Sequence, residues 1–207
     1  MAFVNYQLSI MNYQLKKIII ISTLIIAFLG ITYALYAFLM QIGVDEGYEP
    51  IQPIHFSHKI HAGDNQIDCK YCHSGARTSA VAGVPSLNVC MGCHNTISEY
   101  EGEEDLANGY TKEFYTKEIK KLYEAVGWDE QKFRYTGTAK PVQWIRIHKL
   151  PDFTYFNHSQ HVAVGGLECQ KCHGEVQQME VVHQQAPLTM GWCINCHRQM
   201  PVNANNP

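Results

Sequence analysis

The sequence lacks the charge imbalance that marks many nucleic-acid-binding proteins. Its 207 residues carry 16 Lys and Arg against 19 Asp and Glu. Because there is no basic excess and no long acidic tail, we expect neither a nucleic acid as partner nor a disordered scaffold. The sequence also lacks an unpaired cysteine, since all 8 cysteines fall into Cys-x-x-Cys pairs. Neither a phosphate-binding loop nor a nucleophile–base pair is present, so we expect a chain that is not an enzyme by itself.

The sequence has a single long hydrophobic run, near its N-terminus. Residues 18–40 contain no charged side chain, and a helix of this length covers about 34 Å, which is enough to cross a bilayer core of about 30 Å. Lys16 and Lys17 precede the run and acidic residues follow it. The positive-inside rule therefore predicts that residues 1–17 are cytoplasmic. We expect a single-pass anchor in the lipid of a bacterial inner membrane, with residues 41–207 on the periplasmic side. The alternative is a cleaved signal peptide, whose apolar region is usually only about 7–15 residues long.

Every Cys-x-x-Cys pair is followed directly by a histidine. The cysteines are Cys69, Cys72, Cys90, Cys93, Cys169, Cys172, Cys193 and Cys196, and the histidines are His73, His94, His173 and His197. Two thiols at this spacing can form thioethers with the two vinyl groups on one edge of a porphyrin, and the adjacent histidine then ligates the iron. The sequence therefore predicts four covalently attached haem c groups with these histidines as proximal ligands.

The sequence is also compatible with two other roles for the cysteine pairs. Seventeen residues separate Cys72 from Cys90, and twenty separate Cys172 from Cys193. Both spacings suit a structural zinc site formed by two Cys-x-x-Cys pairs. Four disulfides are the other alternative outside the cytoplasm. Neither alternative explains the histidine after every pair, so haem is the interpretation that we favour.

Candidates for the second axial ligand come from a repeated element, Phe-x-His-x-x-His. It occurs at residues 56–61 and again at 156–161, eight residues before the first cysteine of a motif each time. A repeat with the same spacing 100 residues apart indicates an internal duplication into two di-haem units, at about 55–94 and 155–197. Histidines at i and i+3 of a short helix share a face and can reach two neighbouring irons. The distal candidates are His58, His61, His158 and His161, with His148 as a further candidate.

About 40 residues per haem are too few for a conventional core. We therefore predict a mainly α chain with little regular structure, in which the haems themselves form the core. An insertion at about 95–140 interrupts the duplication, and its residues 112–126 show helical periodicity that ends at Gly127. This helix either packs on the haem domain or offers a docking face to a partner.

The repeated element together with the Cys-x-x-Cys-His motifs resembles the class III multihaem cytochromes c. Residues 144–161 and 187–193 resemble, more specifically, the membrane-anchored multihaem subunit (ActA) of bacterial alternative complex III, a quinol:electron-acceptor oxidoreductase. The resemblance implies that an iron–sulfur subunit passes electrons from quinol to this chain, which relays them to a monohaem cytochrome c or a terminal oxidase. That family usually carries five haems. A longer natural chain with a fifth motif would explain the surplus of histidines, with His148 as ligand of the fifth haem.

The main alternative is a stand-alone, membrane-anchored tetrahaem quinol dehydrogenase that feeds periplasmic reductases. In that type the first motif follows the membrane span closely, whereas 28 residues separate Met40 from Cys69 here. A catalytic haem reductase is a second alternative, but it needs an open iron position. The many spare histidines argue against such a position.

Overall fold

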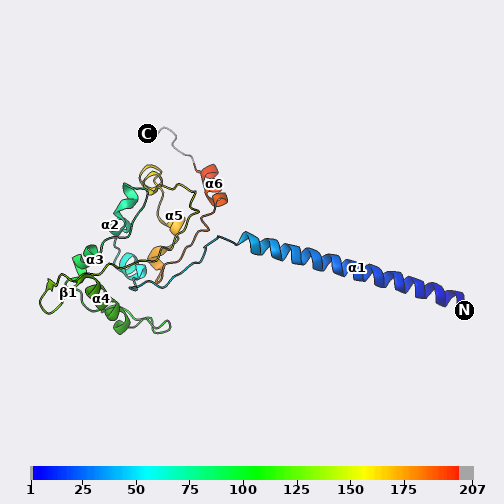
Figure 1. The fold of residues 1–207 in the computed structure, drawn as a ribbon, viewed down its shortest axis with the longest axis horizontal. Coiled ribbons are helices and arrows are strands. Elements are labelled where there is room, and N and C mark those ends of the chain that lie inside the picture. Colours follow the sequence, from blue (N-terminus) through cyan, green and yellow to red (C-terminus); the bar gives the residue numbers. More distant parts are fainter. Residues whose placement is uncertain (1, 201–207) are drawn as a thin grey trace. The chain divides into compact units, whose positions relative to one another are not determined.

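The computed structural model describes residues 2–200, and the chain divides into two units, Met1–Val44 and Asp45–Pro207 (Figure 1). Met1 and residues 201–207, the end of the expected haem domain, lie outside the described residues. In the first unit, helix α1 spans Ala2–Met40. Residues 2–17, expected as a segment before the span, thus continue the same helix.

The apolar part of α1 runs over Tyr13–Met40, with a mean hydropathy of 2.5 and exposed side chains. The hydroxyls of Thr23 and Thr32 donate hydrogen bonds to carbonyls one turn back, both at 2.8 Å, so their polar groups are satisfied within the helix. By length and composition this helix can cross a membrane, and a signal sequence near an N-terminus has the same properties.

The second unit consists of short helices joined by loops. These are η1 (Lys59–Asp64), α2 (Cys69–Cys72), η2 (Ser74–Arg77), α3 (Leu87–His94), α4 (Lys112–Val126), η3 (Gln160–Val164), α5 (Gln170–His173), η4 (Val176–Gln178) and α6 (Met190–Gln199). Strand structure is limited to the antiparallel pair β1 (Trp128–Asp129) and β2 (Arg134–Tyr135), within residues 2–200. The predicted fold class, mainly helical with little regular structure and one N-terminal apolar helix, is confirmed.

Helix α4 is the helix predicted in the insertion, with the same bounds. The Thr111 hydroxyl accepts a hydrogen bond from the backbone N–H of Phe114 at its start, and Gly127 ends it with a φ of +68°. The helix buries an apolar face, as the spacing of its apolar residues requires.

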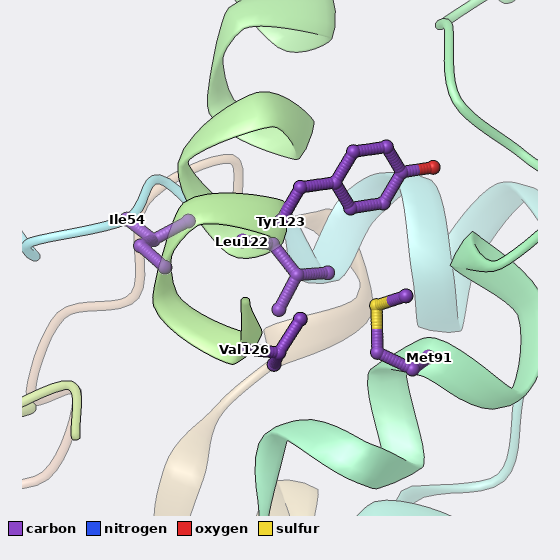
Figure 2. Packing of buried hydrophobic residues seen from close by; sticks show 5 residues of the cluster. All are labelled: Ile54, Met91, Leu122, Tyr123 and Val126. Carbon is purple, nitrogen blue, oxygen red and sulfur yellow. The ribbon is translucent and has the colours of Figure 1, made fainter. Parts of the chain in front are cut away.

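This face forms a small core with α3 (Figure 2). Leu122, Tyr123 and Val126 of α4 lie against Met91 of α3 and Ile54 from the loop before η1. Met91 is only 2% exposed and lies between the two cysteines of the second motif. The insertion is therefore packed on a cysteine-bearing helix, and this apolar face is not free to receive a partner.

Candidate functional site

The two copies of Phe-x-His-x-x-His have the same local geometry. Each leads into a short π-helical segment, η1 or η3. The Phe56 and His61 rings stack at 4.2 Å and 25°, and the Phe156 and His161 rings stack at 4.4 Å and 29°. The duplication seen in the sequence is thus repeated in side-chain positions.

The structure pairs the first histidine of each copy with a motif histidine. His58 lies opposite His73, with ring centres 6.4 Å apart and planes inclined by 4°. His158 lies opposite His173, with corresponding values of 6.3 Å and 7°. We number each site after its motif, so these are sites 1 and 3.

The second histidine of each copy is paired in the same way. His61 lies opposite His94 at 6.1 Å and 51°, and His161 lies opposite His197 at 5.9 Å and 47°. These are sites 2 and 4. Each of the four motif histidines thus faces one of the four distal candidates.

The spacing within these pairs fits a metal ion between the rings. A histidine nitrogen binds a transition metal at about 2.0–2.1 Å, and the nitrogen lies about 1.1 Å from its ring centre, so two opposed imidazoles have ring centres about 6 Å apart. The four observed distances, 5.9–6.4 Å, match this value.

Backbone carbonyls orient several of these imidazoles. His61 Nδ1 donates to the carbonyl of Ser57, and His161 Nδ1 donates to that of Asn157, both at 2.8 Å. His94 Nδ1 donates to a carbonyl three residues ahead, at 3.0 Å. Because a carbonyl only accepts, the proton lies on Nδ1 and the lone pair of Nε2 is free to bind a metal.

The loop 79–83 supplies two more carbonyls of this kind. His73 Nδ1 donates to the carbonyl of Gly83 at 2.5 Å, and His158 Nδ1 donates to that of Ala80 at 2.9 Å. One loop therefore orients a ligand of site 1 and a ligand of site 3.

His173 differs, because its Nδ1 lies 3.0 Å from Nε2 of His148. The two rings meet edge to face, with centres 4.2 Å apart and planes at 87°. His148, the fifth distal candidate, is thus placed behind a motif histidine rather than opposite one.

Three imidazoles are held in the neutral form that binds metals. Burial, followed by neighbouring imidazoles, lowers the pKa of His58, His148 and His173 from 6.5 to about 4. Burial also lowers the pKa of His61. These side chains are therefore unprotonated at neutral pH, as metal ligands must be.

The cysteines lie on or directly before short helices, and two of these helices, α2 and α6, have a side-chain cap. The Asp68 carboxylate accepts a hydrogen bond from Lys70 N at 2.7 Å at the start of α2, and the Thr189 hydroxyl accepts one from Trp192 N at 3.3 Å at the start of α6. Next to the fourth motif is an open, largely apolar pocket. It is lined by Phe153, Thr154, Leu188, Met190, Cys193 and Ile194. Apolar walls beside a motif cysteine suit the face of a porphyrin.

The zinc and disulfide alternatives lack support in residues 2–200. Over this range no three His, Cys, Asp or Glu side chains gather as a metal-ion cluster, although zinc would need four thiolates together. All eight cysteines, which lie in the same range, are free thiols. Paired imidazoles at a metal's spacing, with cysteines and apolar walls beside them, fit haem c.

Glu180, which organises the loop before η1, was not predicted from the sequence. Its carboxylate accepts hydrogen bonds from His55 Nε2 at 2.8 Å, Ser57 Oγ at 2.7 Å and Tyr115 Oη at 2.7 Å. Burial alone would raise the pKa of Glu180, but these three donors outweigh it and hold the pKa below its usual value. Because the Ser57 carbonyl orients His61, Glu180 supports a site 2 ligand indirectly.

Comparison with known proteins agrees with this geometry. Residues 40–126 match the class III cytochrome c family. The chain is also 30% identical over 122 residues to the multihaem cytochrome c subunit of menaquinone reductase from Nitratidesulfovibrio vulgaris. The similarity covers 59% of this chain and 45% of the relative, so the chain spans less than half of that protein's length. Neither match is to alternative complex III, and that finer resemblance stays a prediction. Part of the chain is therefore similar to the class III cytochromes c, a family whose domains carry covalently bound haem c.

Proposed function

We propose that this chain is an electron-transfer subunit that holds four haem c groups, each between two histidines. The observation that carries the proposal is the set of four histidine pairs at a metal's spacing, one for each attachment motif. When bound, haem iron supplies reversible one-electron chemistry. The chain's own residues attach the haem, ligate its iron and set its reduction potential.

The ligand environment sets the kind of electron carrier. Two histidines give a lower potential than a histidine with a methionine. Hydrogen bonds from Nδ1 to carbonyls make the ligating imidazoles more basic and fix their planes. A carrier with such ligands suits low-potential donors and acceptors such as quinones.

The same pairs argue against a catalytic reductase. Such an enzyme needs an iron with an open position, and each motif histidine here is opposed by a second imidazole. The chain is thus proposed as a carrier within an oxidoreductase complex, and not as its catalyst.

The proposed setting is the periplasmic side of a bacterial inner membrane, with α1 as the anchor. The similarity to a menaquinone reductase subunit supports a complex that exchanges electrons with a quinone pool. We propose quinol as donor, an iron–sulfur subunit as the neighbour that passes electrons on, and a monohaem cytochrome c or terminal oxidase as acceptor, as in alternative complex III. The relative's name supports a second candidate, in which electrons flow toward menaquinone.

The test compares the purified chain with the complex isolated from the membrane. The chain alone should be reduced rapidly by small reductants but not by a soluble quinol, because one anchor helix is too little to enclose a quinone head group. In the complex, quinol should reduce the same haems, and under the second candidate the reduced haems should instead reduce a menaquinone analogue. Steady quinol oxidation by the purified chain would contradict the proposal and favour a stand-alone quinol dehydrogenase.

A further inference from the structure

Resting on this proposed function, we propose that the loop 79–83 joins the two halves of the domain and makes sites 1 and 3 the central pair, with sites 2 and 4 as the two ends. The duplication by itself suggests a different order, in which the sites follow one another as their motifs do. Loop contacts between the halves distinguish the two orders.

The loop binds a ligand from each half. The Gly83 carbonyl accepts from His73 Nδ1 at 2.5 Å in the first half. The Ala80 carbonyl accepts from His158 twice, from its backbone N–H at 3.2 Å and from Nδ1 at 2.9 Å. The Ser79 carbonyl accepts from the backbone N–H of Ser159 at 3.1 Å. The start of the second π-helical segment is therefore fixed to the loop that orients the site 1 proximal ligand.

Other groups of sites 1 and 3 are also neighbours. Helix η2, which directly follows the first motif, contacts the π-helical segment η3, which follows His158. The first motif of one half therefore lies beside the distal-histidine segment of the other half.

The reciprocal contact between the halves is also present. Segment η1, which follows His58, packs against η4, which follows the third motif, and the backbone N–H of Lys59 donates to the Met179 carbonyl at 3.0 Å. Each half thus places its distal-histidine segment beside the first motif of the other half.

Sites 2 and 4 also differ in how far other parts of the chain cover them. At site 2, the Tyr123 hydroxyl of α4 donates to the backbone carbonyl of His94, so the insertion closes over this end. At site 4, His197 is exposed, and Phe153 in the adjacent pocket is 78% exposed. A donor and an acceptor that meet the two ends would therefore meet different surfaces.

The test uses two matched variants of the full chain in detergent, His158→Ala and His161→Ala, followed by EPR-monitored redox titration. Covalent haem is counted first by mass, since a chain without four haems would refute the proposed function and not the order alone. Each variant should convert one iron to high spin. His158→Ala also removes the Nδ1 hydrogen bond to the Ala80 carbonyl of the loop, so it should shift the potential and g values of the remaining near-parallel site, site 1.

His161→Ala should leave both sites of the first half unchanged. An unshifted site 1 in His158→Ala, or an equal shift of the first half in His161→Ala, would overturn the proposed order.

A second pair of variants tests the loop without touching a ligand. Gly83 has a φ of +78° and Gly137 in the insertion has a φ of +82°, and a Cβ would meet no atom at either position. Alanine strains the backbone similarly at both. Gly83→Ala should shift sites 1 and 3 together, whereas Gly137→Ala should shift neither. A shift confined to site 1 in Gly83→Ala would contradict a bridging role for the loop.

Discussion

The imidazole planes of His58 and His73 lie within 4° of parallel with ring centres 6.4 Å apart, although 14 residues separate them in the sequence. The same relation recurs between His158 and His173, at 7° and 6.3 Å. In the other two pairs the planes are inclined by 51° and 47°. Since the g anisotropy of low-spin iron depends on the angle between its axial imidazoles, the protein should contain two kinds of low-spin centre in equal number.

Replacing His58 by alanine should open one iron of the four. The proximal ligand His73 and its attachment cysteines remain, so haem content should not change while one centre becomes high-spin. The measurement is EPR and optical spectroscopy of the oxidised protein. His183→Ala is the matched control, because His183 bonds Gln185, lies near the Glu49 carboxylate and belongs to none of the four pairs. If every iron stays low-spin in His58→Ala, the assignment of site 1 is wrong.

His148 is expected to tune site 3 through its contact with His173. Its pKa of about 4 leaves it neutral at neutral pH, so its Nε2 can accept a hydrogen bond from His173 Nδ1, which makes that ligand more basic. His148→Ala should raise the potential of one haem and keep all irons low-spin, while His148→Gln should recover part of the lower potential. A new high-spin iron in His148→Ala would show instead that His148 is an axial ligand, as the sequence suggested.

Glu180 should make the stability of the haem domain pH-dependent on the acid side. Its folded pKa is lowered, so its contribution is complete above the unfolded value of about 4.5 and is lost as the pH falls through the folded value. Glu180→Gln should reduce the free energy of unfolding by about 1–3 kcal/mol near neutral pH, because three buried donors lose a charged acceptor. Denaturant unfolding of the variant should also depend less on pH below about 4.5.

The control for Glu180 is Glu175→Gln, since Glu175 is exposed and its carboxylate accepts a hydrogen bond from the nearby Gln177 amide. Equal losses of stability in the two variants would show that the hydrogen bonds of Glu180 contribute no more to the free energy of unfolding than one exposed hydrogen bond does.

Helix α1 should keep the protein in the membrane. Its Tyr13–Met40 segment buries enough apolar surface in lipid to withstand high-salt and alkaline washing. The haem domain should be released only by detergent, and protease added from the periplasmic side should digest residues beyond 40. A soluble mature form beginning near residue 40 would identify the helix as a signal sequence.

Local patterns predicted the histidines of the site but not their pairing. The spacing of His58 and His61 predicted that they reach two different irons. This prediction needs only the geometry of one helical turn. The motif histidine that each distal histidine faces depends on the path of the loops between them. No local sequence pattern determines that path. The same holds for Glu180, whose partners His55 and Ser57 lie 125 and 123 residues away.

Helices also differ in whether local sequence patterns predict them. The bounds of the helix at 112–126 were predicted, since its apolar stripe and its Gly127 stop are local signals, while its Thr111 cap was seen only in the structure. The π-helical segments η1 and η3 were not predicted, because they arise where two histidines are held toward different sites.

The number of covalently attached haems is measured most directly by the intact mass of the purified chain, denatured so that only covalent groups remain. We expect the mass of the polypeptide plus four haems. Removing one attachment pair, as in Cys193→Ala with Cys196→Ala, should lower the count to three. An unmodified polypeptide mass, with zinc found in the native protein, would contradict this expectation.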